Sequence, residues 1–245
     1  MPVLLPDTIS PTMISHTPIT VPPGAEAILP GVGVLFARFQ NCETDAHLER
    51  VAAYARLIAQ GLARSHYLSP VFIDQLSLMA RLHDVGMVSV PAAILSKPSK
   101  LTAAEMVAMK THVAKGLELV ELAMADVPFA ASPAASMLRN IVAGHHERLD
   151  GSGYPAGLKA PDIALEARIV AVADVFDAMT TTRLYRRVWT EGEIAIEFRL
   201  QVASNKLDGD CVAALMLAQS AREAILQQWP DPPDATQPIH PTPRV

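Results

Sequence analysis

Residues 145–155 read HHERLDGSGYP, two adjacent histidines that lead into an acidic, glycine-rich turn. Neutral imidazole is the commonest protein ligand for transition metals. Gly151 and Gly153 permit backbone conformations that other residues avoid, so we interpret both as structural residues of the turn. Packing alone does not account for such a run. We therefore expect it to form part of a metal site that other ligand-type residues complete.

Ligand-type residues recur on both sides of this run. The chain has eight histidines, and five of them fall in segments with a helical pattern: His47, His83, His112, His145 and His146. The accompanying carboxylates are Asp84 directly after His83, Glu43 one helical turn before His47, and Asp174 one turn before Asp177. A lone helical histidine is more often an ordinary core or surface residue. A mixed set of this size instead favours a site for iron, manganese or zinc.

The hydrophobic pattern between residues 43 and 228 is helical. The expected helices cover residues 43–63, a segment that starts at Ser69 and carries His83 near its end, a segment that starts at Thr102, then 136–146, 165–182, a segment that starts at Thr190, and 209–228. Thr102 and Glu105 form a capping-box pattern at the start of the helix that carries His112. Alternating strand patterns are nearly absent, so the predicted fold class is all-α.

Composition limits the classes of function. The chain has 245 residues, of which 50% are hydrophobic, enough for one sizeable core. A net charge of −5 argues against DNA or an anionic membrane as a general partner. Two cysteines, Cys42 and Cys211, give no disulfide framework. No apolar stretch reaches the ~20 residues that cross a bilayer, and no signal peptide is evident, so we expect a cytoplasmic protein.

Proline marks the two ends of the chain. Seven of the 20 prolines fall in residues 1–30 and six in residues 230–245. Because proline disfavours helices and strand pairing, we expect a flexible segment over 1–30, one domain over 31–228 and a disordered tail over 229–245. Alternatively, these ends bind a partner.

The motifs, taken in order, resemble the HD-GYP family of cyclic di-GMP phosphodiesterases, a branch of the HD phosphohydrolase superfamily. The resemblance runs from about Cys42 to Asp208 and rests on HLERV at 47–51, LHDVG at 82–86, His112 with Gly116, the HHE…GYP run, and DVFDAMT at 174–180. The intervals match as well, since 28 residues separate Asp84 from His112 and 28 separate His146 from Asp174. The implied fold is an HD-domain helical bundle.

The resemblance also implies a metal cluster. It assigns as metal ligands His83, Asp84, His112, His145, His146 and Asp174, with Glu43 and His47 as the additional ligands of a three-metal form. His83 and Asp84 are the implied catalytic pair, and Asp84 can bridge two ions through its two oxygens. Iron and manganese are the expected metals, two or three ions in number, although nickel, zinc or cobalt suit the same ligands. The alternative for Glu43 is a carboxylate on the helix surface.

Further motif residues are candidates for substrate contact. Arg183 and Arg186 can bind phosphate, and Tyr154 can donate its hydroxyl group or stack on guanine. The alternatives are that Arg183 only pairs with Asp177 and that Tyr154 only fills the turn. We expect Asp177 to orient a ligand or Arg183, and Asp150 to hold the turn through its side chain. For Glu147, support of a ligand and exposure to solvent both remain open.

The implied reaction is hydrolysis of cyclic di-GMP to pGpG, with GMP as a second product left open, by attack of a metal-bridged hydroxide on phosphorus. The clearest departure from the family pattern is Met87, which stands where the family usually has lysine, and smaller ones are Leu184 in place of proline and LDG at 207–209 in place of Phe-Asp-Pro. Met supplies neither charge nor proton, and loss of one such contact costs roughly 10²–10³ in rate by analogy with other donors. The alternative function is a weakened module that senses cyclic di-GMP or binds signalling proteins such as diguanylate cyclases. The oligomeric state stays open.

Overall fold

The computed structural model describes residues 45–97, 99–125, 128–181 and 187–231. Within these ranges the chain is helical and contains no β-strand, only an isolated antiparallel bridge between Asp150 and Lys159. The principal helices are α2 (Asp45–Leu62), α3 (Pro70–Ala80), α4 (Ala92–Leu95), α5 (Ala103–Met124), α6 (Pro133–Gly144), α7 (Leu165–Thr180), α8 (Glu191–Ala203), α9 (Gly209–Leu217) and α10 (Gln219–Gln228). The predicted all-α class is therefore confirmed.

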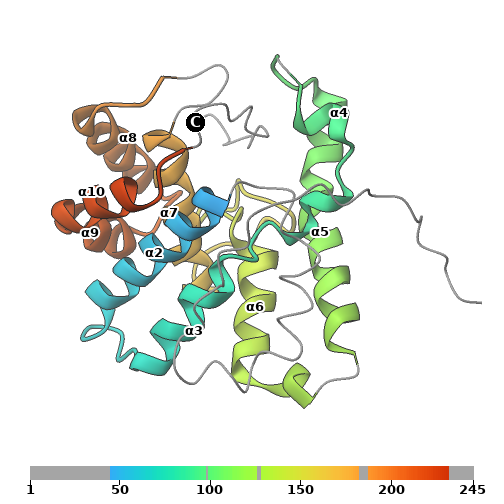
Figure 1. Ribbon diagram of the computed structural model, residues 1–245, viewed down its shortest axis with the longest axis horizontal. Coiled ribbons are helices and arrows are strands. Elements are labelled where there is room, and N and C mark those ends of the chain that lie inside the picture. The colour runs from blue at the N-terminus through green and yellow to red at the C-terminus, as the bar shows by residue number, and fades with distance from the viewer. Residues whose placement is uncertain (1–44, 98, 126–127, 182–186, 232–245) are drawn as a thin grey trace, which may run out of the picture.

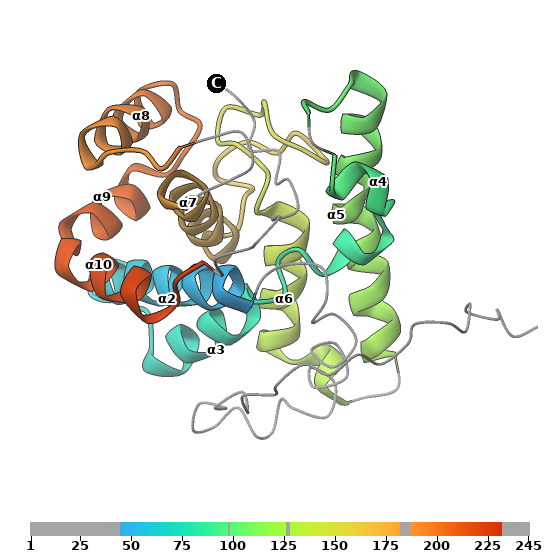
Figure 2. The ribbon, with the colours of Figure 1, turned by 45° about the horizontal axis from the view of Figure 1, so that its top comes forward.

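The bundle is built around α2 and α7. Figures 1 and 2 show α2 beside α3, α7, α9 and α10, while α6 lies between this group and the long helix α5. The predicted apolar stripe of α2 is fully or almost fully buried: Val51, Tyr54, Ala55, Ile58 and Leu62. Both α5 and α7 pack against α6, so α6 joins the long helix α5 to the group around α2 and α7.

Capping residues set several helix starts where the sequence predicts them. The Ser69 hydroxyl accepts a hydrogen bond from the Phe72 backbone N–H at the start of α3. Thr102 and Glu105 form the reciprocal capping box of α5, and Thr190 and Glu193 form that of α8. Each box satisfies backbone N–H groups that have no partner within the helix itself.

Three helix predictions are wrong in detail. His83, His145 and His146 lie just beyond the C-terminal ends of α3 and α6 rather than inside those helices. The expected helix 136–146 begins earlier, at Pro133, because the Ser132 side chain caps it. The expected single helix 209–228 is broken at Ala218 into α9 and α10. Across this break the Arg222 guanidinium donates hydrogen bonds to both the Met216 carbonyl oxygen of α9 and the Glu191 carboxylate of α8, contacts that stabilise the broken arrangement.

Candidate metal centre

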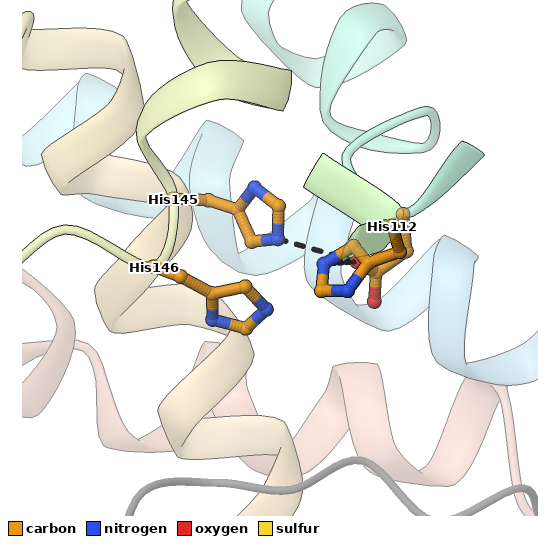
Figure 3. A group of neighbouring side chains, drawn as sticks. His112, His145 and His146 are labelled. Carbon is orange, nitrogen blue, oxygen red and sulfur yellow. Dashed lines mark hydrogen bonds and ion pairs between the residues drawn. The ribbon is translucent and has the colours of Figure 1, made fainter. Parts of the chain in front are cut away.

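Buried histidines and aspartates gather at one place between α2, α5, α7 and the segments that follow α3 and α6. They form two groups, and within each group one potential ligand atom per residue lies within 4.8 Å of the others: Asp84, His112, His145 and His146 in one, and His47, His83 and Asp174 in the other. The residues come from α2, the turn after α3, α5, the loop after α6, and α7. In Figure 3 the rings of His145 and His146 point from that loop toward His112 on α5.

A close backbone approach brings the His83–Asp84 pair to α5. After α3 the chain enters a short 3₁₀ helix, Val85–Ser89, that packs against α5. A Cβ atom at Gly86 would lie 1.8 Å from the His112 carbonyl oxygen. Only glycine fits such an approach, so Gly86 fixes the distance between Asp84 and His112.

The Asp84 carboxylate lies between the two groups. Its Oδ1 is 3.1 Å from His112 Nε2 and 3.2 Å from His145 Nε2. Its Oδ2 is 3.3 Å from His83 Nε2 in the other group. One carboxylate therefore joins the two sets of potential ligands, with one oxygen toward each.

The opposite ring nitrogen of each of these histidines contacts a backbone carbonyl. The Nδ1 atoms of His83, His112 and His145 lie 2.9, 2.8 and 3.0 Å from the carbonyl oxygens of Ala80, Met109 and Ile141, respectively. In a neutral imidazole the proton then resides on Nδ1, and the Nε2 lone pair faces the site. Such a carbonyl contact is the usual support for a histidine that binds metal.

The donor set fits a shared cation. Nε2 lone pairs and carboxylate oxygens repel one another at 3.1–3.3 Å unless a positive charge lies between them. Two ligands that are each about 2.1 Å from one ion, at roughly right angles, are about 3 Å apart. Moreover, Asp174 Oδ1 is buried and has no hydrogen-bond partner in the described part of the chain. Nitrogen and carboxylate ligands together suit iron, manganese or zinc.

Burial and the Asp84 carboxylate have opposite effects on the pKa values of His83 and His145. Burial disfavours the imidazolium form of His83, but the Asp84 carboxylate outweighs it, and the pKa of His83 is raised. At His145 burial dominates over Asp84, and its pKa is lowered. The site therefore holds histidines in different electrostatic surroundings although both contact the same carboxylate.

His47 is held by a buried ionic network. Its Nδ1 lies 2.8 Å from Asp177 Oδ2, and the Arg50 Nε donates to Asp177 Oδ1 at 2.5 Å. Burial alone would raise the pKa of Asp177, yet contacts with His47 and Arg50 lower it. Arg50 also donates to the Trp229 carbonyl oxygen at 2.8 Å and pairs with Asp231 at 2.9 Å, so the chain after α10 contacts the same network. Asp177 thus contacts one of the candidate ligands directly, and its expected role in orienting a ligand stays a prediction.

The sequence did not predict that Arg50 forms an ion pair with Asp177, because Arg50 was considered only as part of the HLERV motif. One signal was present: Arg50 follows His47 by three residues, which places both on the same face of α2. Its partner Asp177 is 127 residues away, and sequence spacing gives no information on that contact.

The turn after His146 is held by two carboxylates. Asp150 Oδ1 accepts hydrogen bonds from the backbone N–H and the hydroxyl of Ser152, which is the local role expected for it. Glu147 is 2% exposed, and its carboxylate accepts from the backbone N–H groups of Ala156, Gly157 and Leu158 at 2.7–3.1 Å. Glu147 thus binds the loop rather than solvent.

Tyr154 is packed against the centre. Its ring stacks on His146 with centroids 4.6 Å apart, and the Lys110 Nζ lies 4.6 Å from the ring centroid. The residue is only 8% exposed, which leaves little ring face for stacking on guanine. Burial raises the pKa of Tyr154, and its hydroxyl has no hydrogen-bond partner among the residues described. The hydroxyl is therefore the group that remains available to a ligand.

Three expected site residues, Glu43, Arg183 and Arg186, lie outside the described residues, so their predicted roles stay predictions. Met87 is described: it is 2% exposed and belongs to a small apolar cluster with Val90 and Met109. A charged side chain at this position would have to leave that cluster to reach the metal-type residues.

Comparisons with known proteins agree with the motif order. A family model described as "HD domain" matches residues 41–210. The chain is 37% identical over 207 residues to a probable cyclic di-GMP phosphodiesterase of Vibrio cholerae, covering 83% of this chain and 46% of that protein. It is 41% identical over 191 residues to the cyclic di-GMP phosphodiesterase response regulator RpfG of Xanthomonas campestris, covering 78% and 47%. The chain therefore spans about half the length of these relatives.

A relative of different stated specificity also matches. The 3'3'-cGAMP-specific phosphodiesterase 2 of Vibrio cholerae is 40% identical over 161 residues, which cover 65% of this chain and 28% of that protein. Among solved structures, Bd1817 of Bdellovibrio bacteriovorus, described as an HDG"Y"P protein, aligns with a TM-score of 0.52 and 19% identity over 77% of this chain and 57% of that one. At that identity the likeness supports the fold alone. Among the described helices, none is both long and apolar enough to cross a membrane.

Proposed function

The chain belongs to the HD-GYP branch of the HD-domain family, and on that premise we propose that it is a metal-dependent phosphodiesterase that hydrolyses cyclic di-GMP. The observation that carries this proposal is the position of Asp84, whose two carboxylate oxygens face two groups of buried ligand-type side chains. Divided in this way, the donors suit a cluster of ions rather than a single one.

The proposed ligands are the residues with donor atoms that converge on the centre. These are His47, His83, Asp84, His112, His145, His146 and Asp174, with Glu43 as a further candidate beyond the described residues. Two or three divalent ions, iron or manganese, would lower the pKa of a water molecule and neutralise charge that develops on the phosphoryl oxygens. His83 and Asp84 are proposed to be indispensable because they supply donors to both groups.

The remaining residues of the site position these donors and the substrate. Asp177, with Arg50, holds the Nδ1 side of His47 so that its Nε2 faces the centre. Glu147 binds the loop that carries Tyr154, whose buried hydroxyl is available to donate to a phosphate oxygen. Arg183 and Arg186 are proposed to contact phosphate as well. Burial of the site excludes bulk water and so strengthens each of these electrostatic contacts.

Cyclic di-GMP is proposed as the substrate because several relatives, including those with the broadest coverage above, are described as acting on it. The proposed product is pGpG, with GMP as a second step. Because one relative is described as specific for 3'3'-cGAMP, the two cyclic dinucleotides should be tested in parallel.

A weakened enzyme that senses cyclic di-GMP is the second candidate. The observation that favours it is Met87, an apolar buried side chain at a position where the family usually has lysine. Such a module would bind cyclic di-GMP and signalling proteins such as diguanylate cyclases while hydrolysing the nucleotide slowly.

One experiment separates these functions. Protein loaded anaerobically with iron or manganese is incubated with each cyclic dinucleotide, the products are separated chromatographically, and binding is measured by calorimetry on the same preparation. Formation of pGpG that is lost in the His83→Ala, Asp84→Ala double variant supports the phosphodiesterase. Tight binding of cyclic di-GMP without product supports the sensor. Neither binding nor turnover by a folded, metallated protein contradicts both.

A further inference from the structure

Arg148 is a buried cation at the edge of the candidate metal centre. The residue is 6% exposed, and its Nη1 donates a hydrogen bond to the Glu147 carbonyl oxygen at 3.2 Å. A guanidinium group carries five N–H donors. Within the described part of the chain, no carboxylate forms an ion pair with Arg148.

The other buried arginines are paired. Arg50 contacts the carboxylates of Asp177 and Asp231, and Arg222 pairs with Glu191. Pairing is the rule because taking a guanidinium group out of water without a counterion is costly. Arg148 departs from this rule among the described residues, because its guanidinium group forms no ion pair there, and a largely buried cation of this kind indicates a place for an anionic ligand.

The position of Arg148 indicates which ligand. It follows His146 by two residues, and its backbone N–H atom lies so close to Gly153 that a Cβ atom there would be 2.4 Å from the nitrogen. The GYP turn is therefore folded back directly against Arg148. Burial lowers the pKa of Arg148, and the negative charge that most strongly opposes this shift is the Asp174 carboxylate at the centre.

We propose that Arg148 binds a phosphate oxygen of the cyclic dinucleotide beside the metal centre, which makes it a substrate-contact residue in addition to Tyr154, Arg183 and Arg186. The inference rests on the proposed function for the identity of the substrate. The planar guanidinium fork matches two phosphate oxygens, and a phosphodiester anion would supply the directly paired counterion that Arg148 does not find among the described residues.

Arg148→Met tests this proposal, because methionine is apolar and of similar length. If Arg148 awaits a substrate anion, replacing it removes an uncompensated buried charge, so the stability of the metal-free protein should stay equal or rise. The matched control is Arg222→Met, which leaves the Glu191 carboxylate without its buried partner and should lower the melting temperature. A melting temperature of Arg148→Met that falls as far as that of Arg222→Met would assign Arg148 a structural role and overturn the proposal.

The functional readouts are the KM for cyclic di-GMP, the metal content and the binding of inorganic phosphate to metal-loaded protein. For Arg148→Met we expect KM to rise about 10- to 100-fold and phosphate affinity to fall about 10-fold, with metal content unchanged. Arg148→Lys, which keeps the charge without the fork, should restore part of both. Unchanged KM and phosphate affinity in Arg148→Met would contradict the inference.

The two proposals fail in different ways. If the wild-type protein hydrolyses neither cyclic dinucleotide, the proposed function fails, while calorimetry with inorganic phosphate still tests Arg148. If the wild type turns over cyclic di-GMP and Arg148→Met does so with the same KM, only the role of Arg148 fails.

Discussion

Asp177→Asn is the substitution that most directly probes how the bundle supports its candidate ligands. The Asp177 carboxylate is buried and contacts both the His47 ring and the Arg50 guanidinium, at 2.8 and 2.5 Å. Asparagine keeps the shape of the side chain but removes its charge. Arg50 would then retain only Asp231 as an ionic partner among the described residues.

The size of the effect follows from burial. Removing one partner of a buried ion pair costs about 3–5 kcal/mol, and the lower figure applies here because the asparagine oxygen still accepts one hydrogen bond. For a chain of this length, about 3 kcal/mol corresponds to a fall of roughly 6–12 °C in melting temperature. His47 would also lose the contact that fixes its tautomer, which typically weakens metal binding about 10- to 100-fold.

The assay is thermal and urea unfolding in the presence of a chelator, followed by metal titration of the refolded protein. Asp74→Asn is the matched control, because Asp74 pairs with Arg56 where the two side chains are 32% and 40% exposed. That pair should contribute no more than about 1 kcal/mol. Equal unfolding free energies for the two variants, together with undiminished metal affinity of Asp177→Asn, would show that Asp177 supports neither the fold nor His47.

Three further variants test separate parts of the structure. Glu147→Gln should lower the unfolding free energy by about 2 kcal/mol, because a neutral amide replaces a carboxylate that accepts hydrogen bonds from three backbone N–H groups. A change below about 0.5 kcal/mol in urea unfolding would show that the loop does not need the charge. Met87→Lys should lower the unfolding free energy by about 1–3 kcal/mol, since the side chain lies in an apolar cluster. A large gain in cyclic di-GMP turnover despite this cost would identify the natural protein as a weakened enzyme. Hydrogen bonds from Lys97 and Thr102 lower the pKa of Glu105 from 4.5 to about 2. The extra stability of the wild type over Glu105→Gln should therefore be present above about pH 4.5 and disappear as the pH falls toward 2. A stability difference that does not vary with pH in urea unfolding would contradict this.

Local signals in the sequence were sufficient for much of the fold. Ser69, Thr102 and Thr190 mark helix starts because their side chains cap backbone N–H groups within three residues, an interaction that depends on nearby sequence alone. The buried stripe of α2 was predictable for the same reason, since its spacing follows the helical repeat.

The exact placement of the ligands was less predictable. His145 and His146 were expected inside a helix, but neighbouring residues on a helix point in different directions and do not face one another. Ending α6 at Gly144 allows both rings to turn toward His112 (Figure 3). Neither a glycine in a left-handed conformation nor a proline marks this end, so the hydrophobic pattern did not reveal it.

Contacts between distant segments lay beyond the sequence altogether. The network from His47 through Asp177 and Arg50 to Asp231 joins α2, α7 and the residues after α10. Likewise, the hydrogen bonds from the Ala156–Leu158 backbone to Glu147 depend on how the loop folds back, not on a recognisable pattern. Such contacts are decided by tertiary packing, and only the structure shows them.

We propose that Asp84 joins two groups of ligands into one catalytic metal centre. The decisive measurement is cyclic di-GMP turnover together with metal content, on wild type and Asp84→Asn loaded anaerobically with iron or manganese. We expect pGpG from the wild type and, for Asp84→Asn, loss of bound metal with at least about 100-fold slower turnover. A folded, fully metallated wild type that forms no product, or an Asp84→Asn variant that is equally active, would contradict it.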